Sequence, residues 1–262
     1  MIEVRNTLRE RLERGEVAIG CYIRMGRTSD VPKMLKVCDF DYVWLDLEHA
    51  AVTLDVGYQM ALSAIDVGIT PLIRLSSQSH SEINLVLTNG FLGVIAPHVD
   101  TAEQAKSVAD CCRFWPDGNR SVPNGFPHFG WAPIPFPEAA KILNKETICV
   151  VMLESREAIR NAEAIAAVPG VDVLKIGGSD LTFEMGIPSQ YGHDKMVEAA
   201  ETVIKACRKH GKHPGLGGVN DNALVEKYVG MGMRYMSTGT DVSFMMAGAK
   251  ARSDFFRGIK LG

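Results

Sequence analysis

A rhythm of eight short apolar runs, separated by helical patterns, constrains the fold of this 262-residue chain more than any other feature. The runs lie at residues 18–23, 42–46, 71–74, 92–97, 148–153, 171–177, 213–217 and 234–239. Most are apolar throughout, which is typical of parallel strands that are covered on both faces. We therefore predict an α/β fold in which residues 1–262 form a single-domain (β/α)8 TIM barrel. An open doubly wound sheet is the alternative, but the sequence lacks the Gly-x-Gly-x-x-Gly turn that it favours.

One long segment interrupts this rhythm. Residues 113–140 are rich in proline, glycine and aromatic residues and have no clear hydrophobic period. A loop of this length in a compact domain usually has a function. We expect a lid over the site or a contact with another subunit, with a packed surface loop as the alternative.

The charge balance excludes several classes of partner. Lys and Arg number 28 and Asp and Glu number 31, so the net charge is -3, which argues against binding to nucleic acid or to an acidic membrane surface.

The first residues contain no apolar signal segment, and no apolar run approaches the roughly 18 residues of a membrane span. The six cysteines form no Cys-x-x-Cys pair, as expected for thiols in a reducing compartment. We expect a cytoplasmic protein.

Polar residues at the ends of the predicted strands indicate a candidate site, because the reactive groups of a barrel project from the C-terminal ends of its strands. Arg74, Glu154 and Asp180 lie at or just after the third, fifth and sixth runs. The second run ends in a short polar segment that contains Asp46, Glu48 and His49. A carboxylate in such a place is more often a helix cap or a salt-bridge partner, so the prediction depends on the whole set.

Glu154 and Asp180 follow adjacent predicted strands. Two carboxylates beside open positions suit a divalent cation that keeps water ligands, such as Mg²⁺ or Mn²⁺. The alternative is that each carboxylate caps the helix that follows it. A cation that held a 2-oxo acid by its carboxylate and keto oxygens would act as a Lewis acid.

The remaining polar residues suit proton transfer and charge stabilisation. Arg74 could stabilise the oxygen of a developing enolate. His49 titrates near neutral pH and can move a proton directly or through a metal-bound water. We expect Asp46 to orient His49 and Glu48 to bind metal waters.

The candidate residues lie in five longer motifs, which are LDLEHA (45–50), LIRL (72–75), MLESREAI (152–159), VDVLKIGGSDLT (171–182) and KHPGLGG (212–218). In these motifs, and over nearly its whole length, the chain resembles the HpcH/HpaI family of metal-dependent, class II pyruvate aldolases. The resemblance implies a (β/α)8 barrel, a Mg²⁺, Mn²⁺ or Co²⁺ ion, and a homohexamer built from dimers that exchange their last helix. It also implies cleavage of 4-hydroxy-2-oxo acids to pyruvate and an aldehyde.

The resemblance assigns roles to individual residues. Glu154 and Asp180 match the metal ligands of the family, and Arg74 matches its enolate-stabilising arginine. His49 with Asp46 matches its proton-transfer pair. The loop whose backbone meets the pyruvate carboxylate corresponds to Gly177, Gly178 and Ser179.

The chain departs from the family at several positions. Ser179 lies in a Gly-Gly-Ser-Asp sequence where the family has Gly-Pro-Ala-Asp, and Thr88 stands in place of an acidic residue that supports the site. The loop sequence Arg-Gly-x-Gly is replaced at residues 120–123, and Arg24 and Tyr22 replace a glycine and its neighbour near the end of strand one. These changes bear on the acceptor aldehyde and on the step after enolate formation. Arg24 is either a clamp for a substrate carboxylate or a surface charge.

Three further features carry weaker signals. Lys175 lies in the sixth run, where a barrel lysine can form a Schiff base, but the class II residues argue against that route. The glycine-rich segments 215–218 and 237–240 suit tight turns. They also suit a backbone approach to the substrate, and for this reason we predict Leu216 as a substrate-binding residue. The other histidines have no ligand spacing and are expected at the surface or in loops; these are His80, His98, His128, His193, His210 and His213.

These expectations combine in a metal-dependent aldolase that acts on a small 2-oxo acid and an aldehyde. A decarboxylase of oxaloacetate-like acids would use the same enolate and is the nearest alternative. A Schiff-base enzyme and a non-catalytic 2-oxo acid binder are the others.

Overall fold

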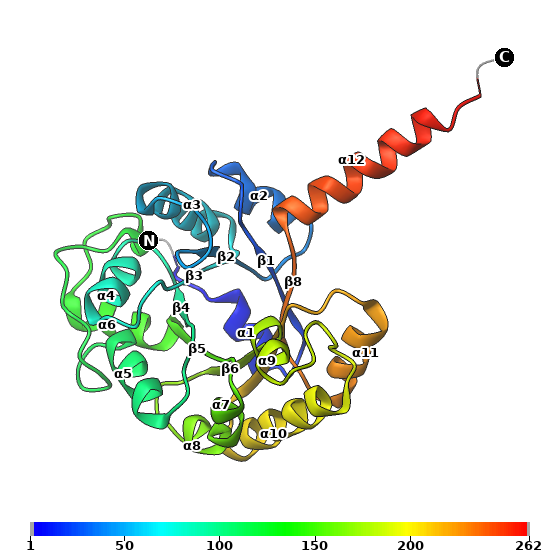
Figure 1. Ribbon diagram of the computed structural model, residues 1–262. Helices are drawn as coiled ribbons and strands as arrows, with labels where there is room; N and C mark the ends of the chain where they lie inside the picture. Colours follow the sequence, from blue (N-terminus) through cyan, green and yellow to red (C-terminus); the bar gives the residue numbers. More distant parts are fainter. Residues whose placement is uncertain (1–2, 261–262) are drawn as a thin grey trace.

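The computed structural model describes residues 3–260, in which eight parallel strands form a closed barrel (Figure 1). The strands are β1 (Ala18–Tyr22), β2 (Tyr42–Asp46), β3 (Thr70–Arg74), β4 (Gly93–Ala96), β5 (Ile148–Leu153), β6 (Val173–Gly177), β7 (His213–Gly217) and β8 (Tyr235–Thr240). Each agrees with its predicted run to within two residues. Because β1 pairs with β8, the barrel is confirmed and the open sheet is wrong.

Helices surround the barrel (Figure 1). They are α1 (Thr7–Glu13), α2 (Asp30–Val37), α3 (Leu54–Val67), α4 (His80–Thr88), α5 (Ala102–Cys112), α6 (Phe136–Glu146), α7 (Arg156–Arg160), α8 (Ala162–Ala166), α9 (Gly178–Glu184), α10 (Asp194–His210), α11 (Asn222–Met231) and α12 (Asp241–Arg257), with a short 3₁₀ helix at Pro127–Phe129. Between residues 3 and 260, no helix is both long and apolar enough to cross a membrane.

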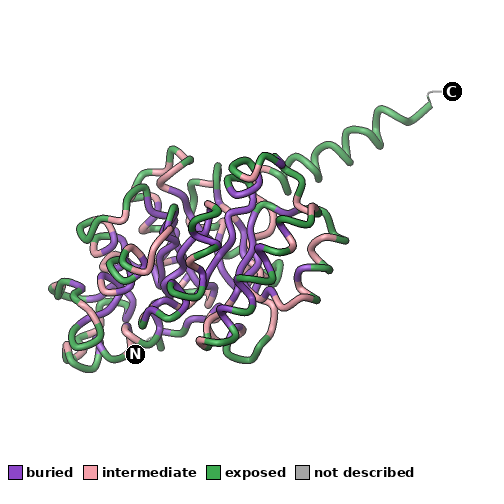
Figure 2. Tube along the Cα trace, turned by 60° about the horizontal axis from the view of Figure 1, so that its bottom comes forward, coloured by how far each residue is buried: buried purple, intermediate pink, exposed green. Residues whose placement is uncertain are grey.

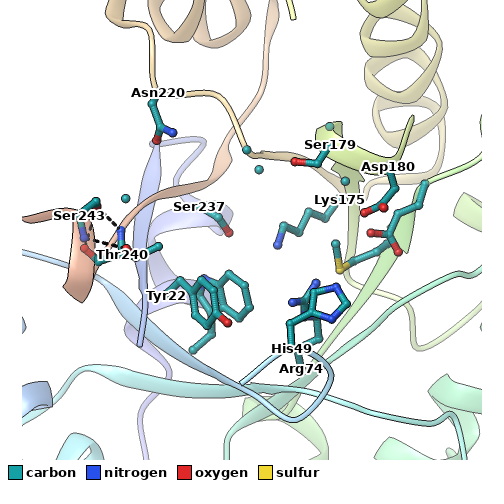
Figure 3. A pocket seen from close by; sticks show the side chains of 18 residues that line it. Tyr22, His49, Arg74, Lys175, Ser179, Asp180, Asn220, Ser237, Thr240 and Ser243 are labelled. Carbon is teal, nitrogen blue, oxygen red and sulfur yellow. Dashed lines mark hydrogen bonds between the residues drawn. The ribbon is translucent and has the colours of Figure 1, made fainter. Parts of the chain in front are cut away.

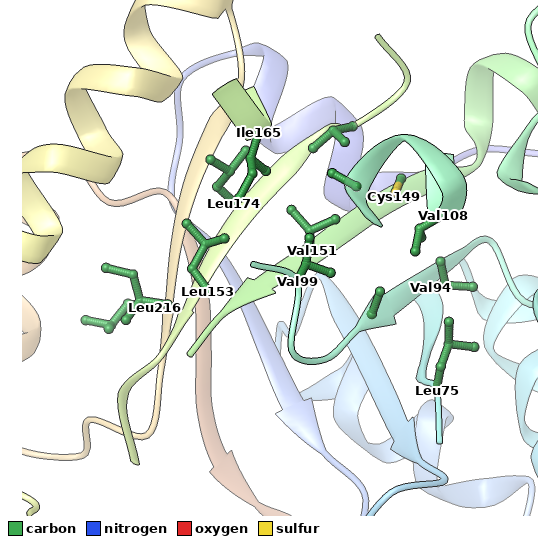
Figure 4. Packing of buried hydrophobic residues seen from close by; sticks show 14 of the residues in the cluster. Leu75, Val94, Val99, Val108, Cys149, Val151, Leu153, Ile165, Leu174 and Leu216 are labelled. Carbon is green, nitrogen blue, oxygen red and sulfur yellow. The ribbon is translucent and has the colours of Figure 1, made fainter. Parts of the chain in front are cut away.

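The hydrophobic core has two layers. The larger lies between the strands and the surrounding helices, where side chains such as Val151, Leu174 and Val108 are fully buried (Figure 4). Figure 2 shows the buried residues concentrated along the strands and the inner faces of the helices. This two-sided burial explains why the strands are apolar throughout.

The inner layer closes the N-terminal end of the barrel. Leu8 and Leu12 of α1 share a buried cluster with Tyr42 and Tyr235, which are the first residues of β2 and β8. The two tyrosine rings stack with their centroids 4.6 Å apart. Since α1 covers this end, a ligand can enter only from the C-terminal ends of the strands.

The segment 113–140 packs against α6 and the start of β4. Phe114, Phe126 and Phe129 form a buried cluster with Leu92 and Leu143. None of the residues 113–140 lines the cavity described below, so the structure gives the lid interpretation no support, and a subunit contact stays a prediction.

Two polar residues of this segment are buried. His128 is fully buried, with Nε2 3.3 Å from the Phe91 carbonyl oxygen, and burial lowers its pKa to about 3. It lies in the loop segment, which was one of the two expected positions, but not at the surface. Arg120 lies over the Phe114 ring and donates to the Leu87 carbonyl, which makes it part of the packing.

The last helix leaves the barrel. Figures 1 and 2 show α12 projecting from the molecule, and none of its residues is buried. It carries exposed large apolar side chains, including Phe244, Phe255 and Phe256.

Candidate active site

A cavity of about 390 Å³ opens at the C-terminal ends of the strands, opposite α1. Seven of the predicted site residues line it: His49, Arg74, Glu154, Gly177, Gly178, Ser179 and Asp180. Figure 3 shows His49, Arg74 and Asp180 around one open space, with Lys175 directed into it. The barrel therefore brings together side chains that are up to 131 residues apart in the sequence, from His49 to Asp180.

Asp46 and Arg74 form a buried, bidentate ion pair. The Arg74 Nε donates to Asp46 Oδ1 over 2.8 Å, and Nη2 donates to Oδ2 over 2.6 Å. The Tyr22 hydroxyl also donates to Oδ2, over 2.6 Å. Burial alone would raise the pKa of Asp46, but the hydrogen bonds from Arg74 and Tyr22 outweigh it and lower the pKa. Asp46 is thus a charged carboxylate that fixes the guanidinium.

This ion pair corrects the expected role of Asp46, because no hydrogen bond in the described chain joins it to His49. The parallel register places Asp46 directly beside Arg74 on β3, whereas His49 lies in the exposed loop after β2. The carboxylate nearest His49 is Glu48, whose Oε2 is 3.8 Å from His49 Nε2. Glu48 also contacts Arg74 Nη1 over 3.0 Å, so it joins the histidine to the arginine.

Glu154 lies at the end of β5, and its side chain is only 3% exposed. Burial raises its pKa, and the nearby Asp180 carboxylate contributes in the same direction. The predicted alternative, a helix cap at Glu154, is wrong because the Ser155 hydroxyl caps α7 by accepting from the Ala158 amide. Asp180 also does not cap its helix, since α9 begins two residues earlier, at Gly178.

The two carboxylates fit a divalent cation. Burial and, to a lesser extent, the Asp180 carboxylate raise the pKa of Glu154, and a cation bound to both carboxylates would favour their charged forms. Across residues 3–260, His, Cys, Asp and Glu form no cluster of three or more that could hold a metal. A pair of protein carboxylates leaves the other coordination positions to water and substrate, as in many Mg²⁺ sites.

His98 contacts two residues of the site, although its own side chain does not line the cavity and the sequence predicts only a surface or loop position for it. It follows β4, and its backbone N–H donates to Glu154 Oε2 over 2.9 Å. Its ring nitrogens lie 3.5 Å from Glu154 Oε2 and 3.2 Å from Glu48 Oε1. His98 directly follows the fourth apolar run, so the rule that reactive groups lie at strand ends also points to it.

Thr88 was expected to occupy a supporting position from the side of strand four. It ends α4 and does not line the cavity, so this placement is wrong, and His98 is the polar residue from that side. The position of Thr88 could not be matched to the family by counting residues, because the chain between the third and fourth strands contains an irregular turn as well as a helix.

Leu216 and Arg24 also lie outside the cavity. The Leu216 side chain is fully buried in the core between the barrel and the helices, while its neighbours Gly217 and Gly218 line the cavity. Period-two alternation along β7 explains this, because successive side chains point to opposite faces. Arg24 is exposed, and its backbone N–H donates to Asp241, so the structure does not support a substrate clamp.

Comparison with known proteins identifies the family of the chain. The sequence model of the HpcH/HpaI aldolase/citrate lyase family matches residues 19–247. A 4-hydroxy-4-methyl-2-oxoglutarate aldolase of Hapsidospora irregularis is 32% identical over 253 residues, which cover 95% of this chain and 94% of that protein. A 2-keto-3-deoxy-L-rhamnonate aldolase of Klebsiella pneumoniae subsp. pneumoniae is 30% identical over 253 residues, which cover 96% and 93%.

The fold comparison gives the same architecture. The crystal structure of an HpcH/HpaI aldolase from Desulfitobacterium hafniense matches with a TM-score of 0.90 at 24% identity, and the match covers 97% of each chain. The predicted family, barrel and enzyme class are confirmed. The chain therefore belongs to the HpcH/HpaI aldolase/citrate lyase family and is a carbon–carbon lyase of the aldolase type.

Proposed function

We propose that the protein catalyses the reversible, metal-dependent cleavage of a 4-hydroxy-2-oxo acid to pyruvate and an aldehyde. The observation that carries this proposal is the shared cavity of Glu154, Asp180 and Arg74 at the open end of the barrel. The two carboxylates suit a hard divalent cation, and the guanidinium suits the oxygen that becomes negative as the carbon–carbon bond breaks. Metal dependence is general among the class II aldolases that the chain resembles.

Glu154 and Asp180 would hold Mg²⁺, Mn²⁺ or Co²⁺, which supplies Lewis acidity toward the keto acid when bound. Arg74 orients and stabilises the enolate oxygen, and its ion pair with Asp46 keeps the guanidinium in place. His49 takes the proton of the C4 hydroxyl during cleavage and returns it during synthesis. Gly177, Gly178 and Ser179 leave their backbone open to the substrate carboxylate.

The test is release of pyruvate from 4-hydroxy-2-oxo acids in the presence and absence of metal. We would assay 4-hydroxy-4-methyl-2-oxoglutarate and 2-keto-3-deoxy-L-rhamnonate first, because the relatives named above are aldolases of these compounds. Chelation with excess EDTA should abolish activity, and added Mg²⁺ or Mn²⁺ should restore it. Full activity in EDTA would overturn the metal assignment.

A decarboxylase of oxaloacetate-like acids remains the second candidate, because the same cation and Arg74 would stabilise the same enolate. Product analysis separates the two reactions, since cleavage yields an aldehyde with the pyruvate and decarboxylation yields CO₂. A non-catalytic binder would hold pyruvate without exchanging its methyl protons into D₂O.

We also propose a homohexamer, a trimer of dimers, in the cytoplasm. The exposed apolar residues of α12 support an assembly in which this helix packs on a second copy. The six free cysteines, of which all but Cys38 are buried, are in keeping with a reducing compartment.

A further inference from the structure

The cavity contains a cationic side chain to which the proposed mechanism gives no role. Lys175 lies on β6, is only 2% exposed, and lines the same cavity as Arg74, Glu154 and Asp180. Its Nζ lies over the Trp44 ring, 4.6 Å from the centroid. Among residues 3–260, no side-chain hydrogen bond or ion pair within 4.0 Å involves Lys175, so the amino group is open to a ligand.

The register of the barrel explains how this lysine reaches the site. Lys175 pairs with Met152 on β5 and Gly215 on β7, one layer below Gly177 and Gly217. Its side chain rises past Gly217, where an added Cβ would lie 2.9 Å from the lysine Cε and 3.4 Å from Nζ. The absence of a side chain at Gly217 thus provides the space through which the amino group reaches the cavity (Figure 3).

The surroundings favour an anion at this position. The Arg74 guanidinium also lies over Trp44, 5.3 Å from the ring centroid, and Tyr22 stacks on Trp44 with centroids 4.3 Å apart. The Lys175 amino group and the Arg74 guanidinium therefore share one aromatic floor in the cavity. Asp46 and Glu48 pair with Arg74, whereas within residues 3–260 no carboxylate lies within 4.0 Å of the Lys175 amino group.

We propose that Lys175 is a further substrate-binding residue, whose amino group binds the keto acid, or the enolate formed from it, beside Arg74. This inference rests on the proposed function and adds a contact that the two carboxylates and the arginine do not supply. No covalent bond forms, and the amino group becomes an ammonium ion that donates hydrogen bonds to a substrate oxygen.

Protonation should accompany binding. Burial lowers the pKa of Lys175 to about 7, and the Arg74 charge adds to the effect. Glu154, beyond the end of β5, and Asp46 and Glu48, at the end of β2, act in the opposite direction. A substrate anion beside the amino group would raise its pKa, so at pH 8 the protein should take up a proton as the ligand binds.

The experiment measures this proton directly. Oxalate, a planar dianion that resembles the pyruvate enolate, is titrated into the Mg²⁺-loaded protein at pH 8 in buffers of different ionisation enthalpy. We expect uptake of about 0.5–1 proton per site for the wild type. For Lys175→Met, the uptake should disappear and the affinity should fall about ten-fold or more.

Two further variants show whether a loss of oxalate binding in Lys175→Met is specific to the position of the amino group. Gly217→Ala keeps the lysine but crowds its end, so it should lower both affinity and proton uptake. Lys212→Met removes a lysine near the start of β7, at the other end of the barrel, where Nζ donates to the Val171 carbonyl oxygen, and it should bind oxalate like the wild type.

Three results would overturn the inference. The first is the same proton uptake in wild type and Lys175→Met. The second is a pyruvate adduct on Lys175 that borohydride traps, because an imine would replace the ion pair. The third is an absence of oxalate binding to the wild type. Assays of metal-dependent pyruvate release on the same samples separate a failure of Lys175 alone from a failure of the proposed aldolase.

Discussion

At the scale of the residue, the buried ion pair between Asp46 and Arg74 decides how the site holds its positive charge. The Asp46 side chain is fully buried and that of Arg74 is 8% exposed, so each charge depends on the other. Removing one member of a buried pair is costly because the remaining charge loses both water and partner. Arg74 is therefore a fixed charge before any substrate arrives, which is what stabilisation of an enolate oxygen requires.

We expect Asp46→Asn to destabilise the protein by about 3 kcal/mol, the lower end of the range for such pairs, because Glu48 still contacts Arg74. The folded-state pKa of Asp46 is lowered, so its contribution is present above the unfolded value of about 4 and is lost as the pH falls through the folded value. Urea unfolding at pH 7 and below pH 4 measures both effects.

Asp30→Asn is the matched control, since Asp30 is exposed, and it should change stability by less than about 0.5 kcal/mol. Equal stability of Asp46→Asn and wild type at pH 7 would contradict the role of the pair.

The buried amine of Lys175 should lower the free energy of unfolding, although it contributes to ligand binding. We expect Lys175→Met to raise the free energy of unfolding at pH 7 by about 1–4 kcal/mol, because an apolar side chain replaces a buried amine. The unfolded lysine binds more protons than the folded one between about pH 7 and pH 10. Wild-type stability therefore rises with pH in this window, and the advantage of the variant shrinks.

Chemical denaturation of the wild type, Lys175→Met and Lys212→Met at pH 7 and pH 9.5 measures this effect. A loss of stability in Lys175→Met at both values would show that the lysine supports the core.

At the scale of the element, the end of β6 shapes the proposed metal site through a missing side chain. A Cβ at Gly177 would lie 2.5 Å from Glu154 Oε1, so the carboxylate fills the space that glycine leaves. The two strands are hydrogen-bonded neighbours, with Leu153 beside Ile176. Their register thus sets the position of Glu154 relative to Asp180, which lies in the first turn of α9.

We expect Gly177→Ala to displace Glu154 and to raise the metal concentration needed for half-maximal activity by about 10–100-fold, as for other changes that disturb ligand orientation. Gly230→Ala is a suitable control, because the Cβ meets no atom within 4 Å and the residue lies inside α11. Titration with Mg²⁺ under the pyruvate-release assay compares the two. An unchanged metal requirement in Gly177→Ala would argue that Glu154 is not a ligand.

At the scale of the whole molecule, the barrel closes within one chain, but no residue of α12 is buried against it. The helix begins in a capping box at Thr240 and Ser243 and then extends away from the barrel (Figure 1). Phe255 and Phe256 contact each other at its far end, and Arg252 covers them in part. An exposed helix with this much apolar surface gains free energy if a second copy covers it.

We expect Phe255→Ser with Phe256→Ser to shift the protein from a hexamer to smaller species, because the two rings lose their apolar burial. Val37→Ser changes an exposed apolar residue on α2 and should leave the assembly unchanged. Analytical ultracentrifugation of the three proteins tests this. A wild type that sediments as a 28.6 kDa monomer would contradict the proposed assembly.

The barrel and most of the candidate site could be predicted from local sequence. Apolar runs and helix caps follow from local preferences, as in the capping box that Thr101 forms with Gln104 at the start of α5. Residues at strand ends, such as Glu154, follow from the barrel, because every strand end points to the same mouth. Local sequence also predicts which residue types face the cavity, though not which of them touch.

The partners of these residues were decided by tertiary structure. Asp46 binds Arg74 instead of orienting His49, because strand register, and not distance along the chain, determines which side chains meet. Leu216 lies outside the cavity for a related reason, since one position along a strand changes the face on which a side chain lies. Lys175 reaches the cavity because Gly217, on a neighbouring strand, leaves it room, and a contact between strands has no signal in either strand alone.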